Sequence, residues 1–539
     1  MLGHAPPSPI PGQRPHPPLY WLLAWVAAWT LTGLIGHTPW RADELTRLAL
    51  ALDALDAGHW LAPRLGGVAW LETPPLATWL AAGAMAAFEP WLPAHDAARL
   101  TSLPALLATF WALLRWSLPR LRRRDRWAAG LALFSAMALV IPAHAGAGEL
   151  WTLTGSALLA AGLTRPDRRW TRTATLLAVG LATSSLAGGA QSWLAGIVGI
   201  AAMSLAAPRR SQHLAHMVGA LAGSLPLLAW AFGLAAQGDL DAWLQADPLL
   251  SMLTGSAAPG GGFFVEIRGL LWSWPLWPLA LAALWQRRSS LLTDPRMLAP
   301  LLLVLGTLLV WWITPGGRDT RALALLAPLA LLAGPGLLRL ERSQAQALHA
   351  FGIVLLFSLL GLLWLFWAGA HLGVPEPFAS RVARLLRHYD GQWSVWQAAL
   401  AVVASLAAGL LVAGLRRSPL RPLLAWCIGA SATWLLVIAL GGHWLETRFS
   451  YQPMARAIET AWPTQGCVGA TPGLRLAVAA AVRAHTQHEV LRGPAGAACT
   501  WALTTLTRGG RGLPAGAEQI WQGRRGGDRQ EWHVLYRRP

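Results

Sequence analysis

Long apolar runs alternate with short polar segments along most of the chain. Runs of about 17 to 25 apolar residues are long enough to cross a bilayer as helices, and about thirteen such segments fit the sequence. The predicted spans cover residues 19–36, 99–118, 127–143, 149–164, 173–189, 190–206, 214–236, 264–285, 297–314, 321–338, 349–370, 394–415 and 422–441. The pattern therefore predicts an all-α polytopic membrane domain over residues 19–441.

The arginine clusters between these runs orient the predicted spans, because short cytoplasmic loops of membrane proteins carry an excess of positive charge. Under the predicted topology the clusters fall on one side, which we assign to the cytoplasm. They lie at residues 120–126, 165–172, 209–210, 287–288, 339–342 and 416–421. Residues 1–18 are polar and rich in proline, and the assignment makes them a disordered cytoplasmic start.

One apolar segment, residues 75–91, tests this topology. A crossing there would put the arginine cluster at 120–126 on the external side, against the charge rule. We therefore predict that the segment lies in the membrane interface as an amphipathic or re-entrant helix. Residues 37–98 then form a first periplasmic loop with interfacial helices.

The tail, residues 442–539, changes from long apolar runs to short alternating elements. Its pattern predicts helices and strands that together form a small periplasmic α/β domain. The predicted helices cover 454–462 and 474–485, and the predicted strands cover 467–470, 500–506 and 531–536.

Composition supports a membrane protein and argues against a nucleic-acid partner. The chain is 55% hydrophobic and 13% charged, with a mean hydropathy of +0.42. Its net charge of +18 comes from arginines in short clusters between apolar runs, which do not form one continuous basic face. Of the three cysteines, Cys467 and Cys499 fall in the polar tail, where an oxidising compartment could join them.

A charged island follows the first apolar run. Asp43 and Glu44 lie side by side there, and Glu72 follows within the same loop. Carboxylates are costly near bilayer depth, so a pair fixed beside a hydrophobic span is a candidate functional site. The alternative for the pair is a solvated helix cap at the membrane edge.

Three motifs follow Asp43 and Glu44 in order. They are Gly-His-Trp-Leu-Ala-Pro-Arg-Leu-Gly-Gly at 58–67, Leu-Glu-Thr-Pro-Pro-Leu at 71–76 and Ala-Arg-Leu-Thr-Ser-Leu-Pro at 98–104. This series resembles the first external loop of bacterial glycosyltransferase family 39, which includes the aminoarabinose transferase acting on lipid A and the protein O-mannosyltransferases. Weaker similarities at 274–279 and 318–328, and a paired-cysteine tail, follow the family's order.

The resemblance implies a GT-C-like fold and an enzyme of the bacterial inner membrane. Such an enzyme takes a sugar from a polyprenyl-phosphate carrier and transfers it to a hydroxyl of a lipid or glycan acceptor on the periplasmic face. Asp43 would be the general base that deprotonates the attacking alcohol. Glu44 would shape the catalytic cavity beside it, and Glu149 would be a second catalytic acid.

The leaving group of this reaction is a lipid phosphate, so the resemblance also implies positive charge or a divalent metal beside it. Arg318 and Arg321 are the phosphate partners, with interfacial snorkelling as their alternative role. Glu72 is a candidate for substrate contact and for metal ligation.

Three more residues are candidates for contact with the substrate. Arg64 and Arg99 belong to the spaced motifs of the first loop. His144 is a candidate for pairing with Glu149, and its alternative is a histidine bonded to the backbone.

Several basic residues of the family pattern are absent. Thr73 follows the glutamate where the family has a basic residue, and Thr46 replaces an arginine that falls one place later here, at residue 47. The alternatives are an enzyme with a different donor or acceptor, and a catalytically altered member that transports lipid-linked substrates or acts as a scaffold. Retention of Asp43, Glu44 and Glu72 favours the enzyme.

Overall fold

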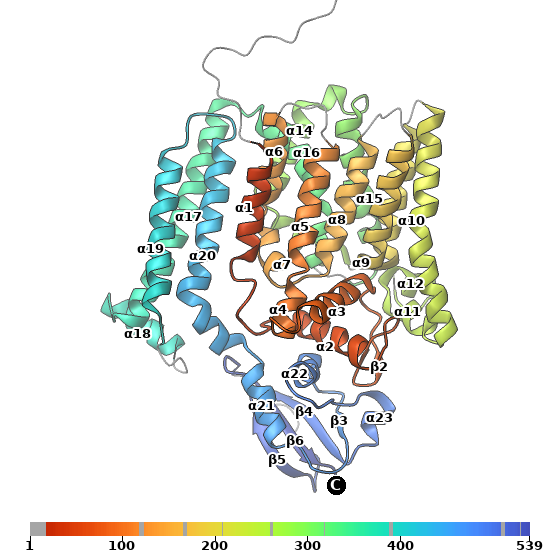
Figure 1. Ribbon diagram of the computed structural model, residues 1–539, viewed down its shortest axis with the longest axis vertical. Coiled ribbons are helices and arrows are strands. Elements are labelled where there is room, and N and C mark those ends of the chain that lie inside the picture. The colour runs from red at the N-terminus through yellow and green to blue at the C-terminus, as the bar shows by residue number, and fades with distance from the viewer. Residues whose placement is uncertain are drawn as a thin grey trace, which may run out of the picture.

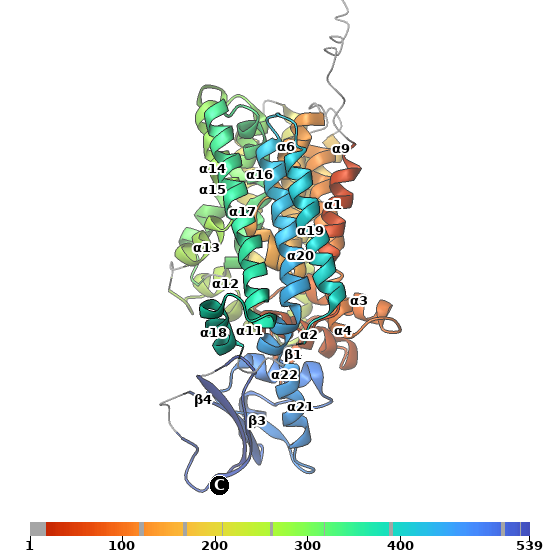
Figure 2. The same ribbon diagram turned by 90° about the vertical axis from the view of Figure 1, so that its left-hand side faces the viewer.

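The computed structural model is a bundle of long helices with a small mixed α/β domain beyond one end (Figure 1). Figure 2, turned by 90°, shows the same stacking along the long axis. The structure describes residues 18–117, 123–164, 170–206, 209–258, 262–316, 319–386, 392–507, 512–528 and 530–539. The predicted disordered start at 1–18 therefore lies outside the described residues, apart from its last one.

Helices along the long axis form the bundle. They are α1 (Tyr20–Leu31), α5 (Ser102–Trp111), α6 (Arg123–Phe134), α8 (Glu149–Leu163), α9 (Trp170–Leu205), α10 (Arg210–Gln237), α14 (Leu276–Gln286), α15 (Pro295–Ile313), α16 (Leu323–Leu337), α17 (Arg342–His371), α19 (Val395–Ala413) and α20 (Arg421–Phe449). Within the described residues, eight helices are long and apolar enough to cross a membrane, or up to nine if one bent pair counts as a span. The helical membrane domain is confirmed in outline, but the count of about thirteen spans is not.

Helix α9 consists of two antiparallel legs joined at Gly189. The backbone there has φ of +75° and ψ of −165°, outside the helical region, and glycine adopts such a conformation because it has no Cβ. The second leg returns along the first, since Gly196 packs against Leu181. The two predicted segments, 173–189 and 190–206, meet at this observed break.

Two breaks in the bundle face each other. The prediction of one continuous span over 264–285 is wrong, because the segment divides near Pro275, which cannot donate a helical hydrogen bond. A second break bends the chain by 60° after α6. The Ala138 nitrogen donates to the Trp272 oxygen at 2.8 Å, so one break satisfies a backbone group of the other. The short helices at these breaks are η2 (Met137–Leu139), α7 (Val140–His144) and α13 (Gly262–Leu271).

The first loop folds across the end of the bundle. Its elements are α2 (Ala42–Asp56), β1 (Arg64–Leu65), β2 (Val68–Ala69), α3 (Leu76–Phe88) and α4 (Ala94–Arg99). Figure 1 shows α2, α3 and α4 between the long helices and the C-terminal domain. The helix predicted within 75–91 is α3, and its depth in a bilayer stays a prediction. Three further short helices were not predicted: α11 (Leu240–Ala246), α12 (Pro248–Leu253) and α18 (Glu376–Leu385).

The C-terminal domain contains a four-stranded sheet in the order β3-β4-β6-β5. Strand β3 pairs parallel to β4, and the other pairs are antiparallel. The domain's elements are α21 (Gln452–Thr460), β3 (Val468–Ala470), α22 (Leu476–His485), α23 (Gly493–Ala497), β4 (Trp501–Thr507), β5 (Glu518–Gly523) and β6 (Glu531–Arg537). All five predicted elements of the tail correspond to helices or strands, whereas α23 and β5 were not predicted. A disulfide joins Cys467 and Cys499, just before β3 and β4.

The C-terminal domain docks on helix α2. A small apolar cluster forms where Leu45 and Ala49 of α2 meet Ala480 of α22. Polar contacts surround the cluster: the Gly66 nitrogen donates to the Glu489 carboxylate at 2.9 Å. Helix α2 is therefore a wall shared by the bundle and the C-terminal domain.

The break in α9 gives the first testable prediction. A Cβ added to Gly189 would stand 2.4 Å from an oxygen of Asp247, and its φ would stay unfavourable for any side chain. Gly189→Ala should therefore lower the free energy of unfolding by at least about 1–2 kcal/mol. The measurement is thermal unfolding of the purified protein in detergent.

The control is Gly361→Ala in α17, where nothing lies within 4 Å of an added Cβ. Alanine favours a helix over glycine by up to about 1 kcal/mol, so this variant should be as stable as the parent or slightly more stable. Equal melting temperatures for the two variants would contradict the description of the break.

Candidate active site

Asp43 and Glu44 occupy the first turn of α2, where carboxylates interact favourably with the helix dipole. Successive residues of a helix point about 100° apart, so the two side chains meet different surroundings. Glu44 is buried, whereas the side chain of Asp43 is 40% exposed. The adjacent acids therefore have different roles.

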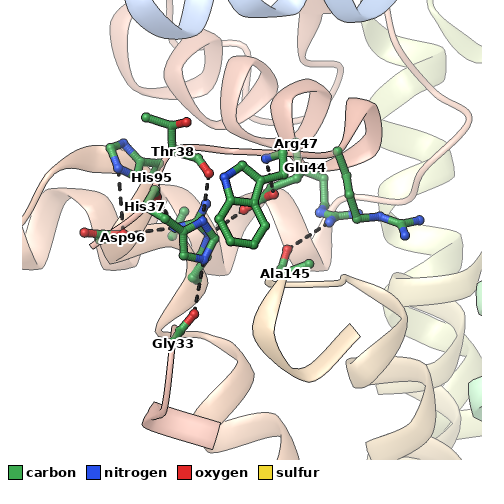
Figure 3. Close-up of polar contacts among 12 residues, drawn as sticks. Gly33, His37, Thr38, Glu44, Arg47, His95, Asp96 and Ala145 are labelled. Carbon is green, nitrogen blue, oxygen red and sulfur yellow. Dashed lines mark hydrogen bonds and ion pairs between the residues drawn. The ribbon is translucent and has the colours of Figure 1, made fainter. Parts of the chain in front are cut away.

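Glu44 belongs to a buried network centred on Arg99, which is 1% exposed. The Arg99 Nε donates to Glu44. The Arg99 Nη1 donates to Asp96 at 3.0 Å and to the His37 carbonyl at 2.6 Å. Figure 3 labels His37, Glu44 and Asp96 among the residues of this polar cluster. A buried guanidinium is tolerated only when it is paired and hydrogen-bonded in this way.

The network corrects two predictions. Arg99 was predicted to contact substrate and Glu44 to shape the catalytic cavity. Neither lines any of the three cavities described below, and each is a partner of the other. Their role in the structure is to hold the start of α2.

The segment before α2 is tied to helix α20 as well. Thr38 donates through its hydroxyl to one oxygen of Glu446 at 2.6 Å, and the Trp40 indole donates to the other at 2.7 Å. The Trp40 nitrogen also donates to Glu44 at 3.2 Å. Helices α2, α4 and α20 are thus joined through one polar cluster.

Asp43 faces a cavity of about 670 Å³. Arg41 Nε lies 3.1 Å from one of its oxygens, and Arg47 Nη1 lies 3.5 Å from the other. Burial by itself would raise the pKa of Asp43, but the charges of Arg47 and Arg41 outweigh it and bring the pKa below its usual value. Asp43 is therefore ionised at neutral pH and can accept a proton.

Arginine is the main charged residue type in this cavity. The guanidinium-bearing residues that line it are Arg41, Arg47, Arg268 and Arg525, and the carboxylates are Asp43 and Glu149. The other polar and aromatic residues of the lining are Thr46, Trp70, Thr73, Thr320 and Tyr451. Positive charge therefore exceeds negative charge at the cavity wall, which suits an anionic ligand.

An apolar groove of about 310 Å³ adjoins the cavity and shares Arg41, Asp43 and Thr320 with it. The groove lies where the two facing breaks of the bundle meet. Its remaining lining residues are Met137, Ala138, Ile141, Pro142, Ala145, Ala147, Gly269, Trp272, Ala322 and Leu323. An apolar surface thus leads directly to the carboxylate of Asp43.

A smaller inner pocket of about 70 Å³ also adjoins the cavity, through Arg47, Thr73 and Glu149. Glu149 begins α8, and one of its oxygens accepts a 2.8 Å hydrogen bond from Thr320. Its other oxygen is buried without a hydrogen-bond partner among the described residues.

Two other predicted site residues line the inner pocket. Arg321 reaches it from η4 (Asp319–Ala322), and Glu72 reaches it from the first loop. The structure thus brings Glu72, Glu149 and Arg321 close to the cavity of Asp43.

His144 lies elsewhere. Its ring nitrogens lie 2.9 Å from the Trp29 carbonyl and 2.6 Å from the Val140 carbonyl, and its ring packs against Trp29 and Trp434. The predicted pair with Glu149 is therefore wrong. The alternative, a histidine bonded to the backbone, is the observed arrangement.

Arg64, a predicted substrate contact, is not among the residues that line the cavity. The Nη2 atom of Arg64 lies 3.9 Å from the Asp239 carboxylate. The residue lines none of the three cavities. Arg318 lies outside the described residues.

A metal site at Glu72 has no support from its surroundings. Within the part of the chain that the structure describes, no three or more His, Cys, Asp or Glu side chains form a group that could hold a metal ion. These residues do not fit a divalent metal, and we derive no chemical step through one.

The sequence pattern missed Arg47, Arg268, Tyr451 and Arg525 as site residues. Arg47 lies one turn after Asp43 on α2, and this spacing of four residues was the available signal. The other three come from α13 and the C-terminal domain, and only the tertiary fold brings them to the cavity.

Comparison with solved structures identifies the fold. ArnT from Cupriavidus metallidurans matches the chain with a TM-score of 0.68, both in the apo state and bound to undecaprenyl phosphate. The sequence identities are 15% and 16%, and each match covers 96% of this chain and 98% of the ArnT chain. The chain has the fold of ArnT. ArnT is a GT-C aminoarabinose transferase, so the predicted GT-C-like fold is confirmed.

The other comparisons add little. EmbB, an arabinosyltransferase from Mycobacterium smegmatis, matches with 16% identity and a TM-score of 0.41, over 88% of this chain and 44% of its own. A similarity of that size supports no conclusion about this chain. No protein-family model and no curated protein matches.

The buried network gives the second prediction. Arg99→Met would leave the carboxylates of Glu44 and Asp96 buried without their cation. Removing one partner of a buried ion pair costs about 3–5 kcal/mol, so the variant should unfold far below the melting temperature of the parent in detergent.

Arg456→Gln is the matched control. Arg456 pairs with Glu459 at 3.1 Å, but its side chain is 60% exposed. Exposed pairs contribute at most about 1 kcal/mol, so this variant should melt close to the parent. A similar loss in both variants would mean that the Arg99 network has no special structural role.

Proposed function

We propose that this chain is a membrane glycosyltransferase. It moves a sugar from a polyprenyl-phosphate carrier to a hydroxyl of a lipid or glycan acceptor on the periplasmic face of the bacterial inner membrane. The observation that supports this most is the continuity of an arginine-rich cavity, an ionised aspartate and an apolar groove. A polyprenyl-phosphate sugar has a matching phosphate, reacting centre and lipid tail.

The arginines suit the carrier phosphate. Arg41 lines both the cavity and the groove, and Arg47 and Arg268 line the cavity. Guanidinium groups bind phosphate oxygens through paired N–H donors, and their charge stabilises the negative charge that grows on a departing phosphate. The phosphate is thus expected where the groove joins the cavity.

The apolar groove suits the first isoprene units of the carrier. Ile141 and Trp272 border it and are 53% and 64% exposed, so the groove has open apolar walls. Burial of apolar surface stabilises such contacts by about 25 cal/mol per Å². The groove therefore gives a lipid tail a route from the bilayer to Asp43.

The inner pocket suits the polar groups of a sugar. Its lining includes the hydroxyl groups of Thr152, Ser156 and Ser184 and the amide of Gln191. Such groups donate and accept hydrogen bonds with sugar hydroxyls. Glu72 and Glu149 also line this pocket, and Glu149 lines the cavity as well.

Asp43 is the proposed general base. As the acceptor oxygen forms its bond to the anomeric carbon, the bond from that carbon to the phosphate oxygen breaks. The hydroxyl proton passes to the Asp43 carboxylate, and the electron pair of the broken bond leaves with polyprenyl phosphate. A positioned carboxylate is needed because a neutral alcohol is a weak nucleophile.

Two further observations support the choice of carrier and membrane face. ArnT has been crystallised with undecaprenyl phosphate. In Figure 1 the junctions of α9 with α10, of α16 with α17 and of α19 with α20 lie at the end opposite the C-terminal domain, and the arginine clusters at 209–210, 339–342 and 416–421 fall at these junctions. The charge rule then favours a periplasmic position for that domain, as does its disulfide.

The third prediction tests the base. Asp43→Asn cannot accept the proton, so sugar transfer should fall by about 10²–10⁴-fold. Membranes with either protein would be assayed for transfer of label from radiolabelled polyprenyl-phosphate sugars to endogenous acceptors. Asp56→Asn is the control, because Asp56 lies on the same helix but pairs with Arg483 outside the cavity. Equal transfer by Asp43→Asn and the parent would remove Asp43 from the mechanism.

The fourth prediction tests the carrier site. Arg268→Gln should weaken binding of undecaprenyl phosphate to the purified protein by about tenfold, the effect of losing one charge-assisted hydrogen bond. Arg288→Gln is the control, because Arg288 lies after α14, donates to the Trp285 carbonyl and lines none of the three cavities. Native mass spectrometry measures both affinities. An unchanged affinity in Arg268→Gln would place the carrier phosphate elsewhere.

A further inference from the structure

The C-terminal domain contributes two side chains to the cavity of Asp43. Arg525 and Tyr451 line this cavity, but neither lines the apolar groove or the inner pocket. Figure 1 shows the domain beyond the end of the bundle, on the far side of α2 from the long helices. The two residues therefore reach the cavity from the C-terminal domain, whereas the residues of the groove belong to the bundle and to the first loop.

The turn that carries Arg525 is fixed in place. The Asp528 nitrogen donates to the Arg525 carbonyl at 3.0 Å, which closes a four-residue turn. The turn presses against the end of α20, where Arg448 donates to the Gly527 carbonyl at 2.8 Å. A Cβ on Gly526 would stand 2.4 Å from a backbone oxygen of α20, so only glycine allows this approach. The position of Arg525 is thus set by close packing.

The guanidinium of Arg525 has unused hydrogen-bonding capacity. Its carbon lies 4.7 Å from the centre of the Tyr451 ring, and among the described residues no hydrogen bond or ion pair involves the side chain. The neighbouring Arg524 differs, because it lies over Trp532 at 4.7 Å and does not line the cavity. Arg525 therefore presents a held positive charge with free donors to the cavity.

We propose that Arg525, supported by Tyr451, binds an anionic group of the acceptor, a phosphate or a carboxylate. The inference rests on the transferase function proposed above and adds that the C-terminal domain completes the site. The carrier phosphate is expected where Arg41 joins the groove to the cavity, and Gly269, the neighbour of Arg268, lines that groove. Arg525 comes from the C-terminal domain, and neither it nor its neighbours line the groove. Asp43 lines both spaces, so an acceptor anchored at Arg525 can direct its hydroxyl to the base.

Binding of soluble sugar anions to the full-length protein tests the proposal. The purified protein, saturated with undecaprenyl phosphate, is dialysed to equilibrium against radiolabelled glucose 1-phosphate or glucuronate, with neutral glucose as the control ligand. The two anions distinguish a phosphate from a carboxylate. The parent should bind at least one of them more tightly than glucose. Arg525→Gln should weaken that binding by about tenfold or more, because it removes a charge-assisted contact.

Three variants make the result specific. Arg524→Gln should bind like the parent, since it removes the same charge from the residue just before the turn, which does not line the cavity. Arg525→Lys should retain part of the affinity, because it keeps the charge but loses the planar pair of donors. Tyr451→Phe should retain most of it, because the ring contact remains. Melting temperatures confirm that each variant is folded.

The outcomes separate this proposal from the transferase function itself. If the parent binds neither anion, or Arg525→Gln and Arg524→Gln lose affinity equally, the acceptor site is wrong. It is also wrong if Arg525→Gln weakens binding of undecaprenyl phosphate, because Arg525 would then hold the carrier phosphate. In each of these cases, retained binding of undecaprenyl phosphate by the parent leaves the proposed function standing.

Discussion

The buried charge of Arg99 fixes the geometry on which the candidate active site depends. A guanidinium with 1% exposure is costly to bury unless carboxylates and carbonyls surround it. Its partners here come from the segment before α2, from α2 itself and from α4, so one charge joins three pieces of chain. Glu44 turns inward to meet Arg99. Because Asp43 precedes it on the same helical turn, the direction of Asp43 toward the cavity follows from the pairing of its neighbour.

The groove beside Asp43 depends on a second constraint, the need of every backbone group in a membrane protein for a partner. A single broken helix would leave its backbone groups unpaired in an apolar surrounding. Here two breaks face each other, and the Ala138 nitrogen finds its partner in the Trp272 carbonyl. Side chains that a continuous helix would pack against its neighbours, such as Ile141, are instead left as groove walls. The two facing helix breaks thus account for both the irregular backbone and the groove.

Sequence alone predicted those features that depend on local pattern. Apolar length predicted the helical bundle, and the hairpin in α9 falls at the predicted boundary because Gly189 allows a turn that other residues disfavour. The tail's elements followed from alternation and turn residues. Pairings between distant segments could not be predicted. Arg99 and Glu44 are 55 residues apart, and each belongs to a motif that resembles part of a catalytic loop. The sequence pattern therefore predicted a catalytic or substrate-binding role for both residues, whereas in the structure they form an ion pair with each other. Arg525 carries no local signal, because all the other residues of its cavity are distant from it in the sequence.

Helix α2 contacts different parts of the protein with its different faces. Glu44 on one side is held by Arg99 of α4, and Leu45 and Ala49 pack against α22 of the C-terminal domain. The cavity has one wall from the C-terminal domain and another from α2 and the bundle, so side chains of one wall can be replaced while the other wall stays the same. The turn at Arg525 rests on the end of α20, whereas the hydrogen bonds of Arg99 go to α4, to α2 and to the segment before α2. Because the side chain of Arg525 makes none of these bonds, replacing that side chain removes no contact that positions Asp43. The fold therefore separates the residues that position the base from the residues available for selecting what reaches it.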